Sequence, residues 1–148
     1  AWVKLFLSVQ DCQPITTMAP LEILKERSGI IRFSSNSISD TFTQFAKPLM
    51  KKLGWPTIFC NELEVAEDGE ITGFRMRIEQ SKLSTVKALQ SIGFETIASG
   101  DSYNDLGMIR ASKAGFLFKS TDQIKNDNPD LPAYETYEEL LAAIKAAV

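Results

Sequence analysis

Two carboxylates lie four residues apart just after a short apolar segment. They are Asp101 and Asp105, in the stretch GDSYND that begins at Gly100. If a helix starts at Ser102, both side chains face the same crevice. Paired carboxylates suit Mg²⁺, which takes one or two protein carboxylates together with waters and a substrate phosphate. The alternative is that Asp101 or Ser102 only caps the next helix.

A second group of polar residues, Ser39, Asp40 and Thr41, lies at a junction that the pattern predicts between a strand and a helix. The first turn of a helix offers unpaired backbone N–H groups and a partial positive charge, which together bind phosphate. The Ser39 hydroxyl would donate one more hydrogen bond. These residue types are also common helix caps, and on their own they favour that interpretation.

Lys82 is the third candidate, because it opens a predicted helix directly after a predicted β-hairpin. A lysine neutralises a phosphate or a carboxylate nucleophile as a compact point charge. Most lysines at such positions are simply solvated, so Lys82 gains meaning only together with the other two groups.

Strand-like and helix-like segments alternate from about Gly29 to the end of the chain, which predicts an α/β domain with a mainly parallel sheet. In such sheets the ligand lies outside the carboxyl ends of the strands. We expect strands at 30–39, 57–60, 95–100 and 114–118, a β-hairpin at 63–78, and helices at 42–53, 81–92, from 102 and at 137–144.

Composition limits the chemistry further. The 148 residues are 44% hydrophobic and 24% charged, as in one globular domain, and the net charge of −3 gives no support to a nucleic-acid partner. The absence of histidine leaves oxygen ligands for any metal. No run approaches the roughly 18 apolar residues that a membrane span needs. Two cysteines without a CxxC motif are typical of reduced thiols in a cytoplasmic protein.

The order hydroxyl, lysine and GDxxxD resembles motifs two, three and four of the haloacid-dehalogenase superfamily. Longer stretches resemble its phosphoserine phosphatase and homoserine phosphotransferase branch, from about Ser39 almost to the C-terminus. The resemblance implies a Rossmann-like core with a mainly parallel sheet and a β-hairpin. It is carried by residues 39–42, 47–50, 53–57, 100–105, 114–118 and 136–140.

The resemblance also implies what the reaction would be. It would be phosphoryl transfer from a small phosphorylated amino acid, such as phosphoserine or a phosphohomoserine-like compound, with Mg²⁺ and an aspartyl-phosphate intermediate. Such an enzyme would belong to serine and threonine metabolism, and a homodimer is a further partner state that we leave open.

Each candidate residue receives an implied role from the same resemblance. Ser39, with Asp40 and Thr41 beside it, would hold the transferring phosphoryl group. Lys82 would neutralise the phosphate and the attacking carboxylate. Asn104 would help to place the substrate.

The implied metal ligands are the two carboxylates of the GDSYND stretch. Asp101 would bind Mg²⁺ directly. Asp105 would support that ligand or the waters on the magnesium ion.

The chain departs from the family at its beginning, because no DxD or DxE motif precedes Ser39. Residues 15–22 resemble the return from a helical cap into the core. We therefore expect residues 1–28 to be a remnant or divergent segment, residues 29–148 to be the core, and the cap domain to be largely absent. The first strand and the nucleophile would then lie upstream of Ala1, and residues 3–9 would supply a substitute strand.

A second alignment makes residues 3–9 the first strand, and Asp11 then becomes a weak candidate for the nucleophile. Gln13 would stand where the general acid belongs, and a glutamine cannot donate a proton as a carboxylic acid does. Surface exposure of Asp11 is the preferred interpretation.

Two further functions stay open at this stage. A catalytically incomplete fragment or pseudoenzyme would bind Mg²⁺, phosphate or a partner protein without turnover. A response-regulator-like receiver phosphorylated on Asp11 shares the α/β sheet and the carboxylates, but it has no place for the predicted hairpin.

Overall fold

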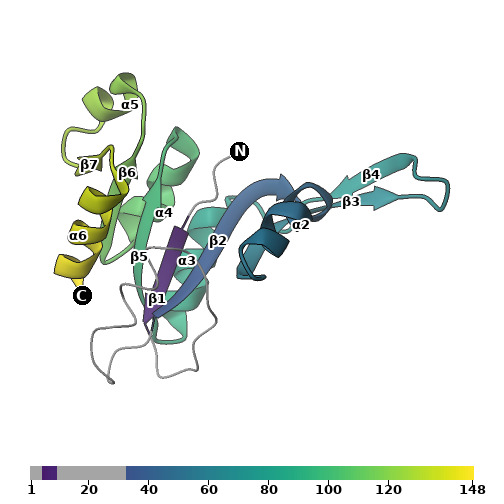
Figure 1. The fold of residues 1–148 in the computed structure, drawn as a ribbon, viewed down its shortest axis with the longest axis horizontal. Helices are drawn as coiled ribbons and strands as arrows, with labels where there is room; N and C mark the ends of the chain where they lie inside the picture. Colours follow the sequence, from purple (N-terminus) through teal and green to yellow (C-terminus); the bar gives the residue numbers. More distant parts are fainter. Residues whose placement is uncertain (1–4, 10–32) are drawn as a thin grey trace.

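A seven-stranded sheet in the order β4-β3-β2-β1-β5-β6-β7 forms the centre of the computed structural model (Figure 1). The structure describes residues 5–9 and 33–148, so Asp11, Cys12 and Gln13 lie outside the described residues. The strands are β1 Leu5–Val9, β2 Phe33–Phe42, β3 Thr57–Val65, β4 Ile71–Arg75, β5 Glu95–Gly100, β6 Ala114–Phe118 and β7 Ala133–Tyr134.

The prediction of a mainly parallel α/β sheet with a β-hairpin is confirmed. Strands β2, β3, β5, β6 and β7 all run in the same direction, whereas β1 and β4 are antiparallel to their neighbours. β3 and β4 form the hairpin, with the turn at Gly69, whose positive φ of 91° suits a residue without a Cβ.

Strand β1 lies between β2 and β5 and runs against both. Its last residue, Val9, pairs with Phe33 and Glu95, which are the first residues of the two neighbouring strands. The last residue of β1 therefore lies beside the first residues of β2 and β5, and not beside the carboxyl ends of these two strands.

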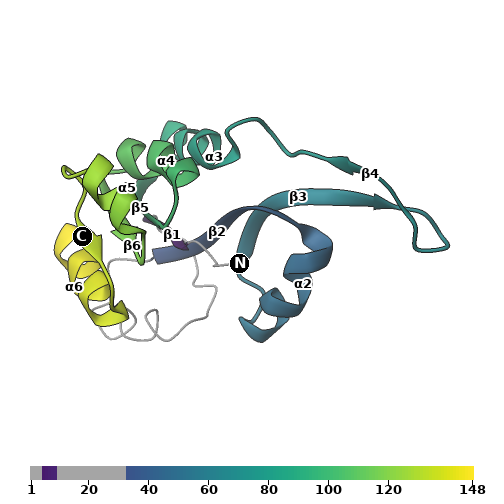
Figure 2. The ribbon, with the colours of Figure 1, turned by 90° about the horizontal axis from the view of Figure 1, so that it is seen from above.

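Helices cover both faces of the sheet (Figure 2). α3, α4 and α5 lie on one face, and α2 and α6 lie on the other. No helix in the described part of the chain has the length and apolar character that crossing a membrane requires. The helices are α2 Thr43–Lys52, α3 Ser81–Ser91, α4 Leu106–Ala111, α5 Asp122–Asp127 and α6 Tyr137–Ala147, and a 3₁₀ turn at Tyr103–Asp105 precedes α4.

Two apolar clusters hold these layers together. Neighbouring residues of a strand point to opposite faces of its sheet, so Ile97 of β5 packs under α6 while Ala98 packs under α3 and α4. Both clusters continue into β6. The first contains Ile97, Phe116, Leu140 and Ile144, and the second contains Ile38, Val86, Ala98, Met108, Ile109, Leu117 and Ile124.

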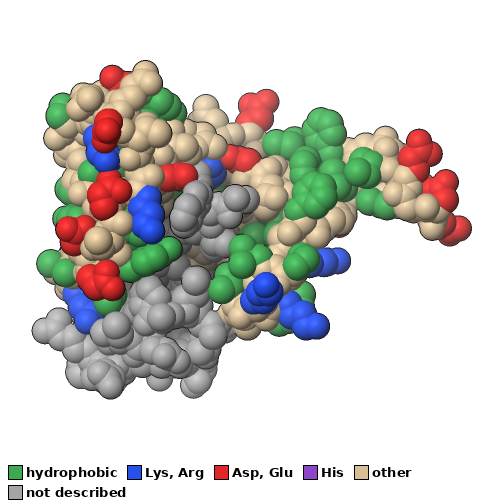
Figure 3. Space-filling view, turned by 45° about the horizontal axis from the view of Figure 1, so that its top comes forward, with side chains coloured by type: hydrophobic (Ala, Val, Ile, Leu, Met, Phe, Trp, Pro, Cys, Tyr) green, Lys and Arg blue, Asp and Glu red, His purple; other side chains and the backbone are tan. Residues whose placement is uncertain are grey.

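The hairpin extends well beyond the rest of the sheet (Figure 1). Figure 3 shows apolar side chains gathered where the hairpin leaves the domain and acidic side chains at its far end. The turn supplies the acidic residues Glu67, Asp68 and Glu70. Exposed apolar side chains in this region are Phe45, Val65, Ile71, Phe74, Met76 and Ile78.

Strand β3, helix α5 and strand β7 differ from the sequence-based expectation. The predicted strands at 57–60 and 63–65 form one continuous strand, β3, which carries the sheet directly into the hairpin. Helix α5 and strand β7 were not predicted, because each is too short to show a hydrophobic period.

Candidate functional site

The candidate residues lie near the carboxyl ends of β2 and β5, where the connections that follow these two strands diverge. From the end of β2 the chain passes through α2 to β3, and from the end of β5 it passes through α4 to β6. The two connections lie on opposite faces (Figure 2). Ligands of open α/β sheets bind at such a switch point, outside the carboxyl ends of the strands.

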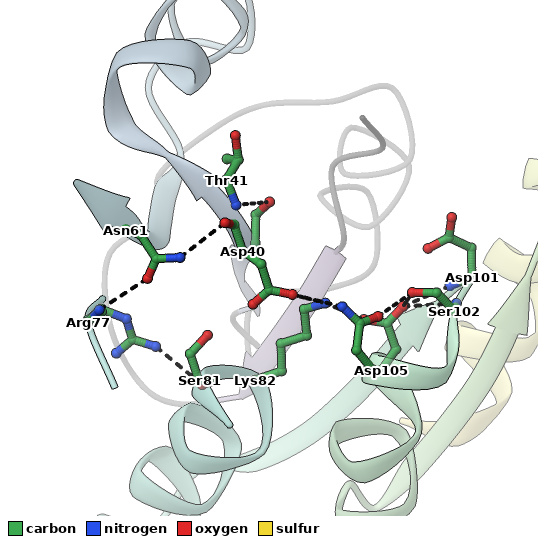
Figure 4. A network of polar contacts seen from close by, with 11 residues as sticks. Asp40, Thr41, Asn61, Arg77, Ser81, Lys82, Asp101, Ser102 and Asp105 are labelled. Atoms are coloured by element: carbon green, nitrogen blue, oxygen red, sulfur yellow. Dashed lines mark hydrogen bonds and ion pairs between the residues drawn. The ribbon is translucent and has the colours of Figure 1, made fainter. Parts of the chain in front are cut away.

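Lys82, in the first turn of α3, lies between the ends of these two strands (Figure 4). Its Nζ is 2.8 Å from Asp40 Oδ2 and 3.0 Å from Asp105 Oδ1. Lys82 is 4% exposed and Asp105 is fully buried, whereas the Asp40 side chain is half exposed. The buried ammonium is held by one carboxylate from β2 and one from the 3₁₀ turn after β5, so charge is concentrated at one point.

Asp105 fixes the loop that follows β5. Its Oδ2 accepts hydrogen bonds from the backbone N–H groups of Asp101 and Ser102, at 3.1 and 3.0 Å, and from the Ser102 hydroxyl at 2.8 Å. A Cβ on Gly100 would lie 2.5 Å from the Cβ and Cγ of Asp105, so only glycine permits this approach. Gly100 and Asp105 are therefore structural requirements of this loop.

The Asp101 carboxylate points away from Asp105 and Lys82 (Figure 4). The two carboxylates of the stretch therefore have different roles. Both oxygens of Asp105 have partners within the protein, so Asp105 holds the loop and Lys82 in place. No group of three or more acidic or cysteine side chains that would hold a metal occurs among the described residues. One carboxylate, completed by waters and phosphate oxygens, still fits the way proteins bind Mg²⁺.

The Ser39–Thr41 segment departs from the prediction of a helix N-terminus. Strand β2 continues through Phe42, and α2 begins at Thr43 with no side-chain cap. The predictions that residues 39–41 form a phosphate-binding helix N-terminus or cap the helix are therefore both wrong. The register of β2 against β3 shifts between Ile38 and Phe42. Within the shifted part, the backbone N–H of Thr41 donates to Ser39 Oγ at 3.3 Å.

Asp40 is held at both its carboxylate and its backbone. Asn104 Nδ2 donates to Asp40 Oδ2 at 2.8 Å, which links the ends of β5 and β2 directly. The backbone carbonyl of Asp40 accepts from Asn61 Nδ2 at 3.0 Å. The sequence placed Asp40 and Asn104 near substrate but did not predict that they contact each other.

Sequence reasoning missed Asn61 and Arg77. Asn61 of β3 is 2% exposed, and its Oδ1 accepts from the backbone N–H of Arg77 at 3.1 Å. The Arg77 guanidinium donates to the Ser81 carbonyl at 3.2 Å and to the Thr85 hydroxyl, and it lies 5.0 Å from the Phe59 ring centroid. These contacts fix the start of α3, where Lys82 lies (Figure 4).

The exposed side of the same loop is tied to α5. The Tyr103 hydroxyl donates to the Asp127 carboxylate, and this hydrogen bond raises the pKa of the phenol above its ordinary value. The loop between β5 and α4 is thus anchored at Asp105 on its buried side and at Tyr103 on its exposed side.

Comparison with known proteins decides the family. The chain is 38% identical over 137 residues to phosphoserine phosphatase ThrH of Pseudomonas aeruginosa, a match that covers 90% of this chain and 67% of that protein. It therefore belongs to the phosphoserine phosphatase family. A phosphoserine phosphatase of Pseudomonas syringae pv. tomato is 37% identical over 137 residues, with 90% of this chain and 58% of that protein covered.

Solved structures place the same fold within this family. A probable phosphoserine phosphatase of Vibrio cholerae superposes with a TM-score of 0.60 at 25% identity, over 76% of this chain and 36% of that chain. A phosphoserine phosphatase in apo form gives a TM-score of 0.60 at 23% identity, over 78% and 58%. This phosphoserine phosphatase-family chain thus spans only part of the proteins it matches, and no family model matches it.

The family assignment confirms the resemblance to the phosphoserine phosphatase branch of the haloacid-dehalogenase superfamily, and the matched relatives are named as phosphatases, which are hydrolases. Of the predicted site residues, Asp40, Lys82, Asn104 and Asp105 form one connected network. Ser39, Thr41 and Asp101 adjoin that network along the chain, and Asp11 lies outside the described residues.

Proposed function

We propose that this chain carries the phosphoryl-transfer site of a Mg²⁺-dependent phosphomonoester phosphatase or phosphotransferase, within a core spanning residues 29–148. The observation that carries the proposal is the buried ammonium of Lys82, held between Asp40 and Asp105 at the ends of β2 and β5. A fixed positive charge at a water-poor position stabilises the charge that develops during phosphoryl transfer.

Substrate phosphate would bind on the half-exposed side of this cluster. The phosphate would share the Lys82 ammonium with Asp40, because Asp40 is the more exposed of the two paired carboxylates. The Ser39 hydroxyl, at the shifted end of β2, would donate to a phosphate oxygen, with the backbone of Asp40 and Thr41 beside it.

Asp101 would hold the magnesium ion, which would neutralise phosphate oxygens during the reaction. Asp105 would keep the backbone at Asp101 in place through its hydrogen bonds to that loop. Asn104 would orient the substrate from the same loop.

A small phosphorylated amino acid, phosphoserine first, is the proposed substrate because the matched relatives carry that name. We propose that the reaction takes place in the cytoplasm, in keeping with the free thiol of Cys60. A homodimer also stays a prediction, and analytical ultracentrifugation of the purified protein tests it.

The test is phosphate release from phosphoserine by the full 148-residue chain, with and without Mg²⁺. We expect release that requires Mg²⁺ and is lost in Asp101→Asn. Lys87→Met serves as the matched control for Lys82→Met, because Lys87 lies on the same helix and is exposed. Phosphate binding without any release contradicts the proposal and indicates a binding protein without turnover.

A further inference from the structure

The hairpin formed by β3 and β4 has two chemically different faces. Residues that lie directly opposite each other in an antiparallel pair share a face of the sheet. Leu63 lies opposite Phe74, and Val65, two residues further along β3, lies opposite Ile71. Glu64, between Leu63 and Val65 in the sequence, belongs to the other face. One face of the hairpin is therefore apolar along both of its strands.

Most of this apolar face is open to solvent. Phe74 is 64% exposed, Ile71 is 59% exposed and Val65 is 47% exposed. Phe45 of α2, which is 65% exposed, extends the same surface. The ring centroid of Phe42 lies 6.2 Å from that of Phe45 and 6.3 Å from that of Phe74, so the helix and the hairpin form one continuous apolar surface. We call Phe45, Val65, Ile71 and Phe74 the hairpin patch.

The position of the hairpin makes this surface unstable in isolation. β4 is the last strand of the sheet on its side, and the hairpin projects away from the domain (Figure 1). A two-stranded hairpin alone in water is marginally stable. Exposed apolar edge strands promote association, and monomeric proteins rarely expose contiguous apolar patches of more than roughly a few hundred Å². The hairpin patch therefore has the character of a binding surface.

Charged side chains of opposite sign lie on different sides of the hairpin patch (Figure 3). The turn at the far end of the hairpin carries Glu67 and Glu70. Helix α2 carries Lys47 and Lys51. All four side chains are exposed, and none of them forms an ion pair within the described ranges 5–9 and 33–148. A partner with the same two groups in the reverse order would complement both.

We infer that the hairpin patch is the interface of a two-fold symmetric homodimer of this chain. A two-fold axis through the patch turns the second copy end for end, so the two apolar surfaces cover each other. The acidic turn of each copy then meets the lysines of α2 in the other copy. Every dimer contains this charge contact twice, which fixes the orientation of the two hairpins.

Analytical ultracentrifugation of the full 148-residue chain over a range of concentrations measures this association. We expect a species of two copies whose dissociation constant rises with salt, because salt screens exposed charges. Ile71→Thr keeps a β-branched residue in β4 and removes apolar surface from both copies. We expect it to raise the dissociation constant by about tenfold or more, with an unchanged circular dichroism spectrum.

Charge exchange tests the orientation. A turn variant combines Glu67→Lys with Glu70→Lys, and a helix variant combines Lys47→Glu with Lys51→Glu. Each variant alone places like charges at both contacts, so we expect it to be monomeric at concentrations where the wild type is a dimer. An equimolar mixture of the two variants has opposite charges at both contacts, and we expect it to form a heterodimer. Lys87→Glu, an exposed lysine of α3, is the control and dimerises like the wild type.

Four results overturn the inference. A wild type that stays monomeric leaves the patch to another protein or to a segment of its own chain. An assembly of more than two copies contradicts a two-fold interface, which closes at two. Variants that dimerise as tightly as the wild type place the interface elsewhere, and a mixture that stays monomeric contradicts the crosswise charge contact. Phosphate release tests the proposed phosphoryl-transfer site separately, because none of the substituted residues belongs to that site.

Discussion

Lys82→Met isolates the energetic role of the buried ion pair. Methionine has a similar length and no charge, so the Asp105 carboxylate loses its counter-ion while it stays fully buried. Removing one partner of a buried pair costs about 3–5 kcal/mol. Asp105 keeps its hydrogen bonds to the loop backbone, and water replaces Lys82 at half-exposed Asp40, so the lower end applies.

Urea unfolding of the full chain measures this cost. With a slope of about 2 kcal/mol per molar urea, a loss of about 3 kcal/mol lowers the midpoint by about 1.5 M. Lys87→Met, on the exposed side of the same helix, changes the free energy of unfolding by less than about 0.5 kcal/mol. Lys82→Met combined with Asp105→Asn costs less than the sum of the two single changes, because the buried charge is gone.

A loss below about 1 kcal/mol for Lys82→Met refutes the reasoning, because that is the range of ion pairs in water. Additive effects in the double variant refute it as well, since independent groups do not share a desolvation cost.

Three further outcomes follow from the contacts. Gly100→Ala places a Cβ 2.5 Å from the buried Asp105 side chain and lowers the free energy of unfolding in urea by about 1–3 kcal/mol. Gly107→Ala, whose Cβ would have its nearest atom at 3.5 Å, stabilises helix α4 by about 0.4–1 kcal/mol. Equal effects of the two substitutions refute this prediction. Thr136→Ala removes the N-cap of α6 and lowers the free energy of unfolding by roughly 0.5–2 kcal/mol, while Thr136→Ser restores most of it. The Arg110 hydrogen bond lowers the pKa of Asp130, so this pair stabilises the fold above the ordinary carboxyl pKa and ceases to do so as the pH falls through the lowered value. NMR titration of the Asp130 carboxyl group will show a higher pKa in Arg110→Met than in the wild type. An unchanged pKa contradicts the assignment.

Local patterns in the sequence determine much of this fold. The apolar spacing after Phe42 predicts α2, and the residues on either side of Gly69 predict the hairpin. Ser99 and Gly100 end β5 with small side chains, so the prediction of a site there rests on local chemistry alone. These features could be predicted because each depends on residues close together in the chain.

Other features depend on contacts that no local pattern encodes. The antiparallel direction of β1 is set by its pairing with strands that begin at Phe33 and Glu95. The end of β2 at Phe42, rather than before Asp40, follows from its shifted register against β3. Asn61 gave no signal in the sequence, because its two hydrogen bonds reach residues 21 and 16 positions away.

The ion pair between Lys82 and Asp40 likewise joins residues from separate elements. The sequence marked both residues as phosphate contacts, and the structure shows that they contact each other. This contact changes the interpretation of Asp40 from a neighbour of the phosphate to a group that competes with the phosphate for the Lys82 ammonium.

A crystal structure of the full chain with Mg²⁺ and inorganic phosphate tests the central claim most directly, namely that the ends of β2 and β5 form one phosphoryl site around Lys82. The account predicts a phosphate oxygen within hydrogen-bonding distance of Lys82 Nζ and Ser39 Oγ, with Mg²⁺ on the Asp101 carboxylate. Phosphate bound elsewhere, or an unchanged contact between Lys82 and Asp40 with no anion beside it at saturating phosphate, would contradict it.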